Sequence, residues 1–75
     1  MDHKRLTNAM TKLGATIETS ATHPSMRIAR KDGRAVAWFI QTNDKGEQSA
    51  VAVHSGESNF HRTIKQAVQY FERGW

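Results

Sequence analysis

Apolar and polar residues near the N-terminus alternate with the period of a helix. We expect this helix to run from Asp2, whose side chain can cap the first turn, to Gly14, which ends it. Its apolar positions fall at i, i+3, i+4 and i+7 and therefore share one face: Leu6, Ala9, Met10 and Leu13.

The C-terminal segment shows the same helical spacing after a polar cluster at residues 55–59. Ser58 or Asn59 can accept a hydrogen bond from the first free helical amides, so we expect a second helix to start there. His61 then falls in its first turn as a solvated polar residue. The apolar positions of this helix are Phe60, Ile64, Ala67, Val68, Phe71 and Trp75.

Between the two helices the period changes to two, which predicts four strands near residues 15–19, 26–30, 35–41 and 50–54. The pair Asp32-Gly33 supplies the positive φ angles that a two-residue hairpin turn requires. A second turn is expected from Asn43 to Gly46. The strand at 35–41 is apolar on both sides and is expected to lie centrally in the sheet.

These elements predict an α+β fold, a two-layer sandwich in which the N- and C-terminal helices pack on one face of an antiparallel four-stranded sheet (α-β-β-β-β-α). A single domain is expected to span residues 1–75. The face expected beneath the helices carries the larger side chains: Ile17, Met26, Ile28, Val36, Trp38, Ile40, Val51 and Val53. The opposite face is expected to be open and to display Arg27, Ala29, Ala37, Phe39, Gln41, Ala50, Ala52 and His54.

Composition narrows the class of protein. The chain has 75 residues and no cysteine, which excludes disulfide-stapled scaffolds and cysteine-based zinc folds. No apolar run approaches the roughly 18 residues of a membrane span, so we expect a cytoplasmic protein with no membrane partner. Eleven Lys and Arg against seven Asp and Glu give a net charge of +4, which favours an acidic partner.

Catalytic and metal-binding patterns are weak. His54-Ser55-Gly56 is the one suggestive run for nucleophilic catalysis, but adjacent strand residues point in opposite directions and no third group orients the base. The four histidines lack the spacing of a zinc site, and the glycines do not form a phosphate-binding loop. We therefore expect no enzyme, no cofactor and no metal.

Basic residues gather in three places. Arg27, Arg30, Lys31 and Arg34 fall within the first hairpin, which we expect to present a positive tip able to pair with phosphates or carboxylates. The alternative is ordinary solubility charge. Further basic stripes are expected on the first helix, at Lys4, Arg5 and Lys12, and on the second, at Arg62, Lys65 and Arg73, where such stripes are more often a solvated face than a binding site.

Phe39 on the open face has three interpretations, of which the simplest is ordinary exposed surface. It can stack on an unpaired base, with Arg27 contacting phosphate. Equally, the alanines around it are expected where two flat surfaces meet, in a homodimer or against a partner protein. The predicted contact residues are Arg27, Arg30, Lys31, Arg34, Phe39, His54, Arg62 and Lys65.

Two resemblances bear on function. The element order resembles that of the double-stranded RNA-binding domain, which also keeps both helices on one sheet face. The runs Leu13-Gly14-Ala15-Thr16-Ile17, Ile28 to Val36 and Thr63-Ile64-Lys65-Gln66-Ala67 resemble small accessory domains of plasmids and phages, including the large polyvalent protein associated domains. This second resemblance implies a protein of a mobile genetic element, a group that includes anti-CRISPR inhibitors.

The working hypothesis is a non-enzymatic binding module of a mobile genetic element. It would use the basic hairpin and the open sheet face to bind nucleic acid or a nucleoprotein complex. The alternative is an anti-CRISPR-type inhibitor that binds an acidic protein surface without touching nucleic acid.

Overall fold

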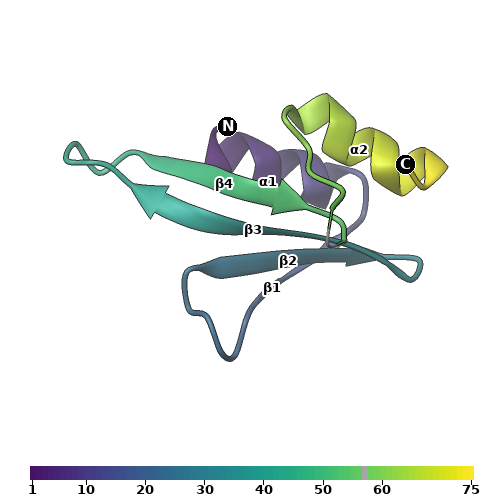
Figure 1. Cartoon of the computed structure of the whole chain (residues 1–75), viewed down its shortest axis with the longest axis horizontal. Helices are drawn as coiled ribbons and strands as arrows, with labels where there is room; N and C mark the ends of the chain where they lie inside the picture. Colours follow the sequence, from purple (N-terminus) through teal and green to yellow (C-terminus); the bar gives the residue numbers. More distant parts are fainter. Residues whose placement is uncertain (57) are drawn as a thin grey trace.

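The computed structural model describes residues 1–56 and 58–75 and has the expected two-layer α+β architecture (Figure 1). Its four strands form one antiparallel sheet in the order β1-β2-β3-β4, and both helices cover the same face of that sheet. The elements are α1 (His3–Lys12), β1 (Thr16–Thr19), β2 (Met26–Lys31), β3 (Arg34–Thr42), β4 (Gln48–His54) and α2 (Ile64–Arg73).

The structure confirms the predicted N-terminal cap of α1 and the two predicted turns. Asp2 caps α1, because its Oδ1 accepts a hydrogen bond from the backbone N–H of Arg5 at 2.8 Å. Asp32 and Gly33 have φ angles of 52° and 77°, as a tight hairpin between β2 and β3 requires. In the second turn, Asn43 Oδ1 accepts hydrogen bonds from the backbone N–H groups of Lys45 and Glu47.

The predicted start of α2 is wrong. Its N-cap is Thr63, whose Oγ1 accepts a hydrogen bond from the N–H of Gln66 at 3.1 Å. Phe60 and His61 are instead extended beside β4: Phe60 forms a bridge with His54, and the His61 N–H donates to the Val53 carbonyl at 2.8 Å. The free backbone groups of β4 therefore hold this segment outside the helix.

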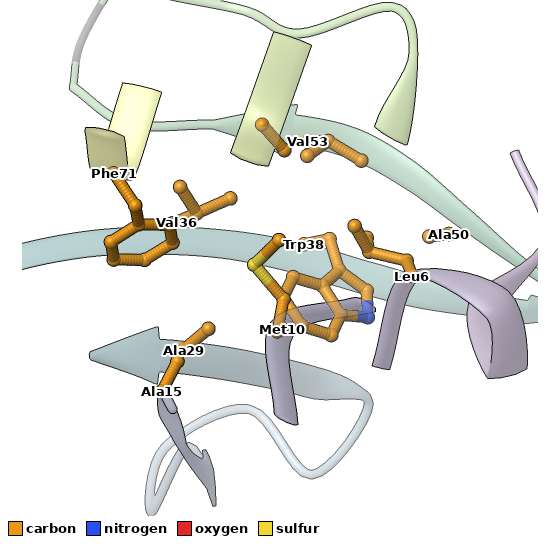
Figure 2. Close-up of a cluster of buried hydrophobic side chains, with 10 residues drawn as sticks. Leu6, Met10, Ala15, Ala29, Val36, Trp38, Ala50, Val53 and Phe71 are labelled. Carbon is orange, nitrogen blue, oxygen red and sulfur yellow. The ribbon is translucent and has the colours of Figure 1, made fainter. Parts of the chain in front are cut away.

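The core lies between the helices and the central strand β3 (Figure 2). Trp38 is fully buried beneath Leu6 and Met10 of α1, and Val36 lies beside Phe71 of α2. Small side chains complete the layer and allow the helices to approach the sheet: Ala15, Ala29, Ala50 and Ala67. The apolar ends of the predicted α2 stripe lie outside the core, since Phe60 is 60% and Trp75 73% exposed.

The register of β2 reverses the predicted faces of that strand. Arg27 pairs with Trp38 and Ala29 with Val36, and directly opposed residues of antiparallel strands share a face. Arg27 and Ala29 therefore face the helix layer, whereas Met26 and Ile28 lie on the open face. The reason is packing: Ala29 is buried together with Ala15, where a larger side chain would not fit.

A bulge in β4 corrects the prediction for a second strand. Ile40 pairs with Ala50 and Phe39 with Val51, but Ala37 pairs with His54, so β4 contains one extra residue. Ala52 occupies the bulge with a φ of 52°. As a result Ala50 is buried and Val51 is 36% exposed on the open face, while Val53 still reaches the core as predicted.

The outer edge of β4 is covered at both ends by other parts of the chain. Met1 exchanges backbone hydrogen bonds with Ala50 at 2.6 and 3.3 Å, and Asp2 forms a bridge with Ser49. At the other end, Phe60 and His61 pair with the strand as described above. Little of this edge remains available for a further strand.

Candidate functional site

The four hairpin cations do not form one patch. Arg27 lies at the opposite end of β2 from the turn, on the helix side, and its Nη1 donates to the Pro24 carbonyl at 2.8 Å. Arg34 Nη1 donates to the Phe71 carbonyl at 2.6 Å and thereby caps the C-terminal end of α2. Arg27 is therefore not on the open face beside Phe39, and Arg34 has a structural role.

Three hairpin cations still border a common hollow. Arg30, Lys31 and Arg34 line a shallow space of about 410 Å³ together with Asp32. Arg30, however, lies on the open side of the sheet and forms an ion pair with Glu18 on β1. Arg30 is paired with Glu18 and the Arg34 side chain is held against α2, so Lys31 is the cation of this turn without a side-chain bond among the described residues.

The solvent side of α1 carries a row of cations. Lys4, Arg5 and Lys12 are all exposed, and no acidic residue lies within the helix. Across residues 1–56 and 58–75 the one ion pair is that between Arg30 and Glu18, so the α1 cations have no carboxylate partner there. We call Lys4, Arg5 and Lys12 the α1 cation row.

Two further predicted contact residues lie in the same layer as this row. Arg62 and Lys65 are exposed at the start of α2, and α2 contacts α1. The backbone N–H of Arg62 donates a hydrogen bond to Gln66 Oε1, and the guanidinium of Arg62 takes no part in this bond. Both helices therefore present cations to solvent.

The open side of the sheet has an apolar centre. Phe39 is half-buried there, opposite Met26 on β2 and Val51 on β4, and the edge of its ring contacts His23 at a centroid distance of 5.9 Å. Its placement on the open face is confirmed. We call the following residues the open-face patch: Met26, Ile28, Ala37, Phe39 and Val51.

A hollow of about 550 Å³ adjoins this patch. Because β4 ends at His54, opposite Ala37, the side chain of Ala35 has no β4 residue beside it. Arg30, His54 and Tyr70 border the space, and Tyr70 reaches it from α2. The structure thus places Arg30 and His54 at the border of one hollow, whose floor is apolar and is formed by Ile28, Ala35 and Ala37. The sequence did not predict that these two residues share a site.

The prediction that His61 is a solvated residue in the first turn of the second helix is wrong. His61 is 8% exposed, its Nε2 lies 2.8 Å from Ser55 Oγ, and its ring packs against Tyr70. Asn59 Nδ2 donates to the same Ser55 Oγ at 2.6 Å, so the Ser55 hydroxyl links Asn59 to His61. Burial, followed by the nearby His54, lowers the pKa of His61 below its ordinary value.

A serine bonded to a neutral histidine is also the first half of a nucleophilic site. Here no carboxylate is bonded to His61 among the residues described, and the imidazole is enclosed between β4 and α2. These contacts hold Ser55, Asn59 and His61 against the end of β4. His61 is buried because it pairs with the edge strand β4. The helical spacing of the apolar residues from Phe60 onward predicted a helix at this position and therefore gave no sign of that pairing.

A metal site and a membrane-spanning helix each have structural requirements. The residues that the structure describes contain no group of three or more His, Asp or Glu side chains placed to hold a metal ion. None of their helices has the length and apolar character needed to cross a bilayer.

No family model matches the chain, and no curated protein or solved structure is significantly similar to it.

Proposed function

We propose that this protein is a nucleic-acid-binding module that contacts a phosphate backbone with its helix layer. The observation that carries the proposal is the α1 cation row, three exposed cations without a carboxylate partner in the described structure. The sequence pI of about 10.0 supports the same choice of an anionic partner.

The spacing of the row suits an extended anion. Arg5 and Lys12 are seven residues apart, which is about 10 Å along a helix axis and brings them to nearly the same side, and Lys4 lies about a quarter-turn away from Lys12. Asn8 and Thr11 lie between them, exposed and uncharged. Their polar side chains can contact phosphate oxygens without opposing the charge. Arg62 and Lys65 extend the positive surface onto α2.

Binding of this kind has a measurable dependence on salt. Neutralising three phosphates on a duplex gives a slope of log K against log salt of about −2.7, and five phosphates give about −4.5. Engagement of the α1 cation row alone therefore predicts the smaller slope. Participation of Arg62 and Lys65 predicts the larger one.

A pair of charge-matched variants tests the surface. The first replaces Lys4, Arg5 and Lys12 with Gln, and the second replaces Arg30, Lys31 and Lys45 with Gln, so that both lose three positive charges. Fluorescence anisotropy with duplex DNA, single-stranded DNA and RNA should show at least about tenfold weaker binding for the first variant and a smaller loss for the second. Equal losses would contradict a contact specific to the helix layer.

A second candidate is an inhibitor that binds an acidic protein surface, because the same exposed cations also pair with carboxylates. The resemblance to mobile-element accessory domains suits either partner, and a nucleoprotein complex would offer both. Nuclease treatment distinguishes them. Partner capture that survives nuclease, together with no measurable affinity for any oligonucleotide, would favour the inhibitor and reject the proposal.

A further inference from the structure

The open-face patch is an apolar surface that the helices leave uncovered, with Ala37 at its centre only 9% exposed. Leu6, Met10, Ala67 and Phe71, the buried residues of the helices, all pack on the opposite face. Val51 is 36% exposed and Phe39 is half-buried, although both are large apolar side chains. A small domain gains stability when such a surface is covered.

Edge pairing is a poor way to cover it. The outer edge of β4 is already bonded to Met1 and Asp2 at one end and to Phe60 and His61 at the other. The bulge at Ala52 further distorts the edge between these contacts. A partner that approaches the sheet from the β4 side therefore packs against the face of the sheet rather than against its edge.

The charge of the patch argues for a particular occupant. Its five residues are all uncharged, and the neighbouring Arg30 is paired with Glu18. A nucleic acid would need unpaired cations on this face, and they lie instead in the helix layer. A neutral and apolar surface with a hollow beside it is complementary to a second copy of itself if an apolar side chain of one copy fills the hollow of the other.

The geometry allows that contact to be reciprocal. Ala37 lies midway along β3 between Phe39 and Ala35, and all three side chains lie on the open face. A two-fold axis that crosses the strands at Ala37 places Phe39 of each copy over Ala35 of the other. Ala35 is in the floor of the hollow of about 550 Å³, so each ring enters the hollow of the opposite copy.

We infer that the open sheet faces of two copies of this chain pack together in a homodimer in which each Phe39 occupies the hollow of the other copy. The contact is small: strands about 4.8 Å apart and about 3.4 Å per residue give a face of roughly 20 Å by 20 Å, or roughly 800 Å² for both copies. Stable interfaces bury about 1,200–2,000 Å². The dimer is therefore weak, with an expected Kd of about 100 μM.

Analytical ultracentrifugation of the full chain from about 10 μM to about 1 mM tests the dimer. The mass should rise from 8.5 kDa toward twice that value, 2 × 8.5 = 17.0 kDa. Phe39→Ala and Ala37→Arg should each weaken association at least about tenfold. Gln48→Arg adds the same charge at an exposed position of β4 outside the patch and should leave association unchanged.

Mixing two variants tests the predicted register. Phe39→Lys and Ala35→Glu should each be monomeric alone, whereas their mixture should associate because Lys and Glu meet across the axis. Far-UV circular dichroism checks that each variant folds. If Ala37→Arg does not fold, Phe39→Ala alone tests whether the patch mediates association. A wild-type chain that is monomeric at about 1 mM, or a Phe39→Ala chain that associates like wild type, would overturn the inference. Nucleic-acid binding uses the other layer, so the two proposals fail independently.

Discussion

Replacing Trp38 with alanine removes the largest side chain of the core. Trp38 has no exposed surface, and its Nε1 donates a hydrogen bond to His3 Nδ1 at 3.0 Å. A tryptophan buries about 200–250 Å², which at about 25 cal/mol per Å² corresponds to an upper bound of about 5–6 kcal/mol. Measured truncations of this kind cost about 3–5 kcal/mol.

That loss is comparable with the whole stability of the domain. At about 0.05–0.15 kcal/mol per residue, 75 residues give a free energy of unfolding of about 4–11 kcal/mol. Trp38→Ala should therefore be largely unfolded or close to it. Trp38→Phe keeps an aromatic ring, and its extra cost comes from the smaller ring and from the lost donor to His3, about 1–2 kcal/mol.

Urea unfolding followed by far-UV circular dichroism measures both variants. With an m value of about 1 kcal/mol per M, Trp38→Ala should lower the midpoint by about 3 M or more, and Trp38→Phe by less. Trp75 is 73% exposed, so Trp75→Ala is a control that removes the same residue type from the surface and should keep its midpoint. A Trp38→Ala midpoint within about 0.5 M of wild type would refute the core described above.

Two predictions concern other parts of the fold. Burial lowers the pKa of both His61 and His3 below the ordinary value of 6.5, and the nearby Arg27 lowers that of His3 further. At pH values between 6.5 and these lower pKa values, the unfolded chain therefore binds more protons than the folded chain. The free energy of unfolding should therefore fall as the pH drops below about 6.5, and a His61→Gln variant should show a flatter urea midpoint against pH. Ala52 adopts a φ of 52°, so Ala52→Gly should raise the melting temperature by a few degrees, and a lower value would show that the bulge is unstrained.

Local signals in the sequence predicted the elements well. Helical spacing in α1, the cap at Asp2 and the Asp32-Gly33 turn depend on neighbouring residues, and the structure confirms each of them. The two-layer arrangement follows because three apolar surfaces had to cover one another. The choice of face for Trp38 and Phe39 came from the same alternation and is correct.

Side-chain size misled the prediction for β2 and β4. Met26 and Ile28 are larger than Ala29, but α1 and β1 crowd the sheet at Ala29, so the small residue is the one that fits inside. In β4, Val51 and Val53 are two residues apart and would share a face in a regular strand. The bulge at Ala52 separates them, and no local residue pattern announced it.

The candidate surfaces were only partly predictable for the same reason. Exposure of Arg62 and Lys65 followed from the helical pattern. The fates of Arg27, Arg30 and Arg34 depended on partners distant in the sequence, such as the Phe71 carbonyl, which lies 37 residues from Arg34. Charge counted along a chain therefore overstates the charge that a folded surface offers.

The covered edge of β4 has a consequence for how the chain acquires its structure during synthesis. The Met1 backbone, which precedes α1, bonds to Ala50, 49 residues later, so α1 is synthesised before the sheet but is among the last elements to find its place. Until β4 leaves the ribosome, α1 is a short amphipathic helix with an apolar side in water, which is only marginally stable alone. We expect the native packing to form in one late, cooperative step, and a truncation after β3 to be a target for chaperones and proteases.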